Sequence, residues 1–258
     1  MICSASTNIG MRRRVNQDAF RLRKYTERTS LCVVCDGMGG ARGGEVASKL
    51  AADAFVNTID QFILPYVKNK NKQVGTSDIK RALAKAVNIA NEEVYLAANK
   101  NPEYEGMGTT LVAALIIDKN IFVINVGDSR LYKLKGDSIK QITKDHSWVQ
   151  EMIDMGKLKP EDAKTNTNRH MITKAVGTSP MVEGSIYALK VEEGSFLLLC
   201  TDGLTGMVDD DVICNIVSKN GHSSRLDQVE LDLRVRKLID TANRNGGHDN
   251  VTVVLARI

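Results

Sequence analysis

Short apolar runs rich in β-branched residues recur along the chain, and they constrain its fold more than any other feature. Each run is bounded by Gly, Asp or Asn, which is typical of buried β-strands. The runs cover residues 31–35, 110–117, 121–126, 196–200 and 251–258. Residues 117–121 and 135–138 are predicted to be hairpin turns, and the second turn joins strands at 130–134 and 139–142.

Helical periodicity appears between these strands. Apolar residues step by three or four along residues 78–99, and helices are also predicted at 44–63, 209–219 and 226–242. Residues 68–77, between the first two helices, are predicted to be a surface loop. Because the helices cluster between hairpin-linked strands instead of alternating with them, the pattern favours an α+β fold with antiparallel sheets and helices outside.

Residues 145–180 follow neither pattern closely. A short helix is predicted at 148–155, and a polar stretch with almost no apolar residues follows at 162–169. We therefore expect a mobile excursion from the main body. Long segments of this kind often carry function.

The length and composition are those of an ordinary globular protein. A chain of 258 residues, 43% hydrophobic and 26% charged, suits one large domain or two at most. The first residues lack the pattern of a secretory signal, and no apolar run approaches the ~20 residues that span a bilayer. We therefore expect a cytoplasmic protein that does not enter a membrane.

The cysteines point to the same compartment. There are five, an odd number without the spacing of a disulfide framework, which fits a reducing environment. Cys32 and Cys35 form a Cys-x-x-Cys sequence, which could indicate redox chemistry or zinc. They lie three residues apart in a predicted strand, so they point to opposite faces, and no second pair completes a zinc site. We interpret both as core residues.

The net charge of +4 is mild, and the basic clusters are short and dispersed. They lie at residues 12–14, between 68 and 72, and at 234–237. No aromatic residues interleave them, and no helix-turn-helix or finger pattern accompanies them. We interpret these clusters as solvated faces and expect no binding of nucleic acid.

Four aspartates stand where apolar strands begin or end, each beside glycine or a Gly-rich turn. Asp36, Asp128 and Asp202 each follow an apolar run, and Asp249 precedes the last one. A single Asp-Gly pair has a purely structural explanation, because such pairs are common in turns. Turn formation does not explain four carboxylates at strand ends, because each carboxylate is costly to bury without a partner.

A shared cation would resolve that cost. Mg²⁺ and Mn²⁺ take oxygen ligands and keep several bound waters. Glycine after Asp36 or Asp202 also lets the backbone come close, so that a carbonyl oxygen can serve as a ligand. The aspartates therefore favour a site for hard divalent cations.

Seven blocks of residues, in order along the chain, carry a resemblance to a known family. They are Arg13 with residues 16–18, and residues 36–40, 107–110, 127–130, 145–147, 201–203 and 246–252. Together they resemble the metal-dependent protein phosphatases of the PPM (type 2C) family, in its bacterial form. Each block alone is a weak signal, but the ordered set is specific, and the resemblance runs from about residue 4 to residue 258.

The resemblance implies one catalytic domain over residues 1–258. Its fold would be a sandwich of two antiparallel β-sheets flanked by α-helices on both outer faces. Residues 145–180 would form a flap near the active site. This fold agrees with the α+β pattern of strands and helices described above.

The resemblance also implies a metal centre at one end of the sandwich. Asp36 would bridge two central Mn²⁺ or Mg²⁺ ions, and the carbonyl oxygen of Gly37 would bind one of them. Asp202 and Asp249 would complete the first site, and Asp128, with Asp202, would hold a third and weaker cation. Two cations about 3.5–4 Å apart can lower the pKa of a bridging water and clamp an in-line displacement, so that no protein nucleophile is required.

Two further residues would complete the site. Asp18 would hold metal-bound water, and Arg13 would bind phosphate oxygens in a bidentate way that lysine could not reproduce. Because Arg12 and Arg14 flank it, the choice of Arg13 rests on its spacing of five residues before Asp18.

The chain departs from the family pattern in places that bear on proton transfer and substrate choice. Eukaryotic members have histidine where this chain has Met38, and bacterial relatives often have histidine where it has Ala41. A histidine general acid at position 38 is excluded, so protonation of the leaving group would fall to metal-bound water. Residues 165–169 also look unlike typical relatives, so substrate choice cannot be carried over.

The resemblance implies hydrolysis of phosphoserine and phosphothreonine in phosphorylated signalling proteins, opposing a cognate Ser/Thr kinase. We expect a monomer. The alternative is a catalytically inactive relative that acts as a binding module. Such proteins typically lose one or more metal-binding aspartates, whereas this chain keeps all four.

Overall fold

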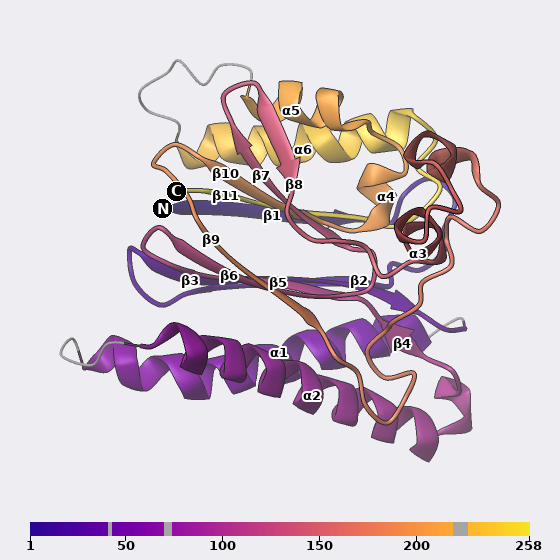
Figure 1. Cartoon of the computed structure of the whole chain (residues 1–258), viewed down its shortest axis with the longest axis horizontal. Coiled ribbons are helices and arrows are strands. Elements are labelled where there is room, and N and C mark those ends of the chain that lie inside the picture. The colour runs from indigo at the N-terminus through magenta and orange to yellow at the C-terminus, as the bar shows by residue number, and fades with distance from the viewer. Residues whose placement is uncertain (41–42, 70–73, 219–226) are drawn as a thin grey trace.

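Two antiparallel β-sheets lie face to face, and helices cover the outer face of each (Figure 1). The computed structural model describes residues 1–40, 43–69, 74–218 and 227–258. The first sheet has the strand order β1 (Ile2–Asn8), β11 (Val251–Arg257), β10 (Phe196–Cys200), β7 (Arg130–Lys135) and β8 (Ser138–Gln141). The second has the order β2 (Asp18–Lys24), β3 (Thr29–Met38), β5 (Leu111–Ile117), β6 (Asn120–Val126) and β9 (Ser185–Lys190), and the short β4 (Gly108–Thr109) pairs with β3.

Helices form the outer layers. α1 (Gly43–Lys68) and α2 (Thr76–Lys100) pack on the second sheet, and α5 (Asp210–Ser218) and α6 (Gln228–Arg244) pack on the first. These are the four predicted helices, although residues 219 and 226 of the predicted spans lie outside the described residues. None of the helices in the described ranges is long and apolar enough to cross a membrane. The predicted α+β sandwich with helices on both outer faces is confirmed.

The strand β3 shows why the apolar runs are uninterrupted. Leu31, Val33 and Cys35 face α1 and α2, whereas Cys32 and Val34 face the other sheet, and all five side chains are buried. Because both faces of the strand lie in apolar layers, it shows no alternation of apolar and polar residues. Cys32 and Cys35 thus lie in different layers, and all five cysteines are free thiols. The interpretation of Cys32 and Cys35 as core residues is confirmed.

Three strands, β1, β2 and β9, lack the apolar runs by which the other strands are recognised. All three lie at sheet edges. An edge strand leaves part of its surface to solvent and can carry polar and charged residues, as Arg21 and Arg23 of β2 illustrate. The strand β3 also differs from its prediction, because it continues through Asp36 and Gly37 to Met38.

The predicted flap, residues 145–180, contains α3 (Trp148–Asp154) and the 3₁₀ helix η2 (Pro160–Thr165). Two isolated β-bridges hold the flap. Ser147 pairs with Ile172 within the flap, and Val176 pairs with Thr109 of the main body. No residue of α3 is fully buried. Figure 1 shows α3 at the same end of the sandwich as α4 (Asp202–Thr205). The mobility of this segment remains a prediction.

The apolar layer between the two sheets joins them, and Leu199 of β10 is fully buried within it. We expect Leu199→Ala to lower the free energy of unfolding by about 3 kcal/mol, because a cavity adds to the lost apolar burial. Leu96→Ala on α2 should cost less than about 0.5 kcal/mol, because Leu96 is 45% exposed. Urea unfolding measures both variants, and equal losses would contradict the assignment of this layer.

Candidate active site

Strand ends bring five aspartates together at one end of the sandwich. Asp18 and Asp36 stand opposite each other in the β2–β3 register. Asp128 lies in the turn between β6 and β7, Asp202 begins α4 directly after β10, and Asp249 stands just before β11. The other four carboxylates all lie close enough to Asp36 to raise its pKa. The four predicted metal ligands and Asp18 therefore form one cluster.

Asp18 is the most deeply buried member of the cluster, with 5% exposure. Its Oδ2 accepts hydrogen bonds from the hydroxyls of Thr252, at 2.7 Å, and Thr201, at 3.0 Å. Its Oδ1 is buried without a hydrogen-bond partner, and the same is true of Oδ1 of Asp202. Buried oxygens of this kind are costly to leave unpaired, and a hard cation or an ordered water would satisfy them.

The backbone of Asp36 is held on both sides by the chain that leads into β5. Its N–H donates to Oγ1 of Thr110 at 2.9 Å, and its carbonyl accepts from the Thr110 N–H at 2.8 Å and from the Thr109 hydroxyl at 2.9 Å. At the next residue, a Cβ atom on Gly37 would lie 1.9 Å from the carbonyl oxygen of Gly44. Only glycine fits this approach between β3 and the start of α1.

A second close approach joins α4 to Asn250, the residue just before β11. A Cβ atom on Gly203 would lie 1.9 Å from the carbonyl oxygen of Asn250. The side chain of Asn250 in turn donates through Nδ2 to the carbonyl oxygens of Ile9, at 2.9 Å, and Val15, at 3.0 Å. Asn250 therefore fixes both ends of the segment that carries Arg13.

Of the three consecutive arginines, Arg13 reaches the cluster. Its Nη2 donates to Oδ2 of Asp249 at 2.6 Å. This hydrogen bond is the main cause that raises the pKa of Arg13, and the charges of Asp36 and Asp202 add to it. The side chain remains 51% exposed, so its other N–H groups are open to a bound anion.

Crowding of like charges perturbs the whole cluster. Burial raises the pKa of Asp18 to about 7, although its two threonine partners lower it. Burial raises the pKa of Asp36 well above its usual range, and Asp18 and Asp202 raise it further. Burial, followed by Asp202 and Asp145, raises the pKa of Asp128 to about 8. Too many carboxylates share too little positive charge at this end of the sandwich.

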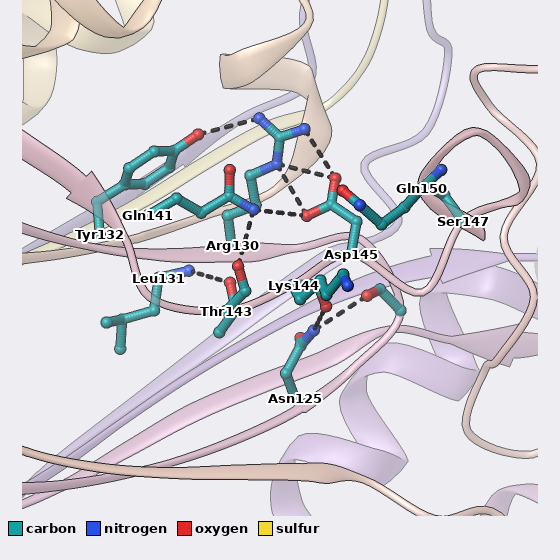
Figure 2. A network of polar contacts seen from close by, with 11 residues as sticks. Asn125, Arg130, Leu131, Tyr132, Gln141, Thr143, Lys144, Asp145, Ser147 and Gln150 are labelled. Carbon is teal, nitrogen blue, oxygen red and sulfur yellow. Dashed lines mark hydrogen bonds and ion pairs between the residues drawn. The ribbon is translucent and has the colours of Figure 1, made fainter. Parts of the chain in front are cut away.

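Figure 2 shows the polar network around Arg130, which follows Asp128 by two residues in the chain. Arg130 forms a bidentate ion pair with Asp145, with Nη2 2.7 Å from Oδ2 and Nε 3.0 Å from both carboxylate oxygens. Nη1 of Arg130 donates to the Tyr132 hydroxyl at 3.0 Å, and Nε2 of Gln141 donates to Oδ1 of Asp145 at 2.9 Å. The network ties the beginning of the flap to β7.

His146, the next residue, ties the flap to the same turn. Its Nδ1 accepts from the N–H of Gly127 at 3.1 Å, and its own N–H donates to the Gly127 carbonyl at 3.0 Å. Nε2 lies 2.9 Å from Oγ of Ser185. Burial lowers the pKa of His146, so the neutral ring donates from Nε2. The flap therefore starts from a fixed position relative to Asp128.

The donor set fits the predicted cations in its chemistry. Carboxylate oxygens and the carbonyl of Gly37 are the ligand types that Mg²⁺ and Mn²⁺ take. In the described part of the chain, no three His, Cys, Asp or Glu side chains stand as a ready ligand group around one point. The carboxylates repel one another, and Arg13 pairs with Asp249 at the edge of the cluster.

The residues that support the carboxylates are the part of the site that the motifs do not predict. Thr201, Thr252 and Thr110 bind Asp18 and Asp36 directly. The only signal in the sequence is that Thr201 stands beside Asp202 and Thr252 stands three residues after Asp249; Thr110 is far from Asp36 in the chain. Of the two positions discussed for a general acid, Met38 lies in β3 opposite Gly108 of β4, and residue 41 lies outside the described residues.

Comparisons with known sequences identify the family of this chain. The family model for protein phosphatase 2C matches residues 11–239. The serine/threonine phosphatase stp of Listeria innocua serovar 6a is 33% identical over 249 residues, which cover 96% of this chain and 92% of that protein. The chain belongs to the protein phosphatase 2C family, as its motifs predict.

Solved structures agree as well. The serine/threonine phosphatase Stp1 from Staphylococcus aureus matches with a TM-score of 0.85 and 33% identity, over 99% of this chain and 94% of that one. The catalytic domain of the phosphatase PstP, solved in complex with two manganese ions, matches with a TM-score of 0.80 and 32% identity, over 99% and 97% of the two chains. Both likenesses confirm the predicted fold.

The raised pKa values make the stability of the metal-free protein depend on pH. The stability that comes from protonated Asp18 and Asp128 is fully present below about pH 4. It is lost as the pH rises through about 7 for Asp18 and about 8 for Asp128. In EDTA we expect the protein to be less stable at pH 8 than at pH 6 by about 2 kcal/mol, or roughly 4–8 °C in Tm.

Calorimetric melting with and without Mn²⁺ measures this dependence. Mn²⁺ should raise Tm more at pH 8 than at pH 6, since it replaces the protons. Asp18→Asn serves as the control and should show a shallower loss between the two pH values. A wild-type protein that is equally stable at both pH values in EDTA would contradict the assigned crowding.

Proposed function

We propose that this protein phosphatase hydrolyses phosphoserine and phosphothreonine in proteins, using divalent cations held by Asp36, Asp202 and Asp249. The observation that carries the proposal is the cluster of five carboxylates with Arg13 at its exposed edge. A phosphate dianion is repelled by such a cluster unless cations neutralise it. The relative PstP, solved with two manganese ions, supports Mn²⁺ or Mg²⁺ as the cofactor.

The ligands divide among the cations as the resemblance implies. Asp36, the carbonyl of Gly37, Asp202 and Asp249 would hold the central cations. Asp128, on the flank of the cluster, would hold a third cation with Asp202. When bound, the cations supply a water that ionises near neutral pH and neutralise the charge of the phosphoryl group.

The side chains around the cations position the reactants. Arg13 presents N–H donors beside Asp249 and binds two phosphate oxygens in a fixed orientation. Asp18 is held by two threonines through Oδ2, which leaves Oδ1 free to accept a hydrogen bond from a water in the site. The two residues thus act on opposite partners, since Arg13 orients the phosphate and Asp18 orients the water.

The proposal extends to the cellular setting of the enzyme. The five free thiols are consistent with a cytoplasmic enzyme. The chain acts as one catalytic domain over residues 1–258, with residues 145–180 as its flap, and as a monomer. It opposes a cognate Ser/Thr kinase in signalling and acts on substrates of that kinase. The inactive binding module is disfavoured, because every aspartate of the ligand set lies in the cluster.

Turnover should require the cations and their ligands. We expect Mn²⁺- or Mg²⁺-dependent release of phosphate from p-nitrophenyl phosphate and from a phosphothreonine peptide, abolished by EDTA. Asp202→Ala should lower kcat more than a hundredfold, because loss of a direct ligand exceeds the roughly 10–100-fold cost of losing an outer partner. Asp137→Ala, an exposed aspartate at the β7–β8 turn, is the control and should keep full activity. Metal-independent turnover, or an active Asp202→Ala enzyme, would refute the mechanism.

The choice among the three arginines is tested separately. Arg13→Lys keeps the positive charge but loses the bidentate geometry, so we expect KM for the phosphothreonine peptide to rise about tenfold. Arg12→Lys is the matched control and should leave KM within about twofold of wild type. Steady-state kinetics at saturating Mn²⁺ measures both. The reverse order of effects would move the phosphate-binding role to Arg12.

A further inference from the structure

A cleft on the outer side of α6 adjoins the active site. It has a volume of about 760 Å³ and is lined by Met11 of the β1–β2 loop and by Leu233, Arg236, Lys237, Asp240 and Arg244 of α6. Figure 1 shows α6 crossing the outer face of the first sheet towards the end that carries α3 and α4. The cleft, called here the α6 cleft, lies outside the carboxylate cluster.

The α6 cleft combines apolar and cationic side chains on one helix face. Residues 233, 236, 237, 240 and 244 recur at steps of three or four, which places them along one side of the helix. The opposite side of α6 packs into the core. Leu233 is 52% exposed and Met11 is 66% exposed. An exposed apolar pair flanked by charges is typical of a binding surface.

The charge of the cleft is positive. Its lining holds three cationic side chains and one anionic side chain, Asp240. Within the described residues, Lys237 takes part in no ion pair, and neither do Arg12 and Arg14, which follow Met11 in the exposed loop. The cleft therefore offers cations for an external anion, next to a cluster whose own side chains are acidic.

Met11 links the cleft to the loop that carries Arg13. The N–H of Met11 donates to the Gly247 carbonyl at 2.7 Å, and a Cβ atom on Gly247 would lie 2.7 Å from Cγ of Met11. Met11 stands two residues before Arg13, and Gly247 stands two residues before Asp249. Arg13 and Asp249 form an ion pair. An extended peptide advances about 3.3 Å per residue, so a few residues lead from a phosphate at Arg13 into the cleft.

We propose that the α6 cleft binds an acidic segment of the phosphoprotein substrate, a few residues away from the phosphorylated side chain. An apolar residue of that segment packs between Met11 and Leu233, and its carboxylates face Arg236 and Lys237. The proposal rests on the proposed function and adds the substrate class of that same site. A peptide is favoured over a membrane surface because the apolar and cationic groups line a cleft that leads to the site, and such complementarity of charge and shape selects a partner.

The test compares three substrates of the Mn²⁺-loaded enzyme: a phosphothreonine peptide with an acidic segment beside it, the same peptide with neutral residues in that segment, and p-nitrophenyl phosphate. We expect a higher kcat/KM for the acidic peptide. In the double variant Arg236→Glu, Lys237→Glu this preference should fall about tenfold through KM, since two favourable charge contacts become repulsive. Turnover of p-nitrophenyl phosphate, which is too small to reach the cleft, should stay within about twofold of wild type.

The control variant makes the same change of charge elsewhere. Lys80→Glu, Lys85→Glu reverses two exposed lysines on α2, which covers the other sheet, and should leave the peptide preference unchanged. An equal loss in both double variants would overturn the proposal, because it would show a general effect of net charge. So would an unchanged preference in the α6 variant, or loss only of binding to anionic vesicles of phosphatidylserine, which would make the cleft a membrane contact. Failure of the proposed function itself would appear instead as no turnover of p-nitrophenyl phosphate with any cation.

Discussion

Repulsion among five carboxylates is the constraint around which the active end of the molecule is built. Asp18 and Asp36 stand opposite each other on neighbouring strands, and Asp128, Asp202 and Asp249 reach the same place from strand ends. Left to themselves, such groups would separate or take up protons, and the raised pKa values of the cluster express that tendency. The two sheets hold the carboxylates together because Asp18 and Asp36 are fixed by the β2–β3 register, and the other three each stand two residues from a strand end.

The residues around the carboxylates offset part of the unfavourable free energy of bringing these charges together. Glycine at positions 37 and 203 lets neighbouring segments approach to distances that any side chain would prevent. Thr201 and Thr252 satisfy one oxygen of Asp18 but leave the other without a partner. The site is thus stable enough to form and is still short of positive charge. Such a deficit of positive charge favours the binding of divalent cations.

The sequence predicts those parts of the fold and the site whose signal lies in a short stretch of the chain. Strands buried on both faces, such as β3 and β10, appear as apolar runs, and the aspartates at their ends appear as motifs. The edge strands β1, β2 and β9 carry no such run, because solvent covers part of their surface. The choice of Arg13 over its neighbours follows from its spacing to Asp18. The contacts that Arg13, Asn250 and Asp145 make join residues that are not neighbours in the chain, so only the folded structure shows them.

The central claim is that this carboxylate cluster holds divalent cations, and diffraction tests it most directly. A crystal grown with Mn²⁺ and measured at the manganese absorption edge gives an anomalous map in which only the metal ions scatter strongly. We predict two strong peaks beside Asp36, one of them within ligand distance, about 2.1–2.3 Å, of Asp202 and Asp249. A weaker third peak is expected beside Asp128. A fully loaded crystal with no peak at Asp36, or with manganese bound only elsewhere, would contradict the account.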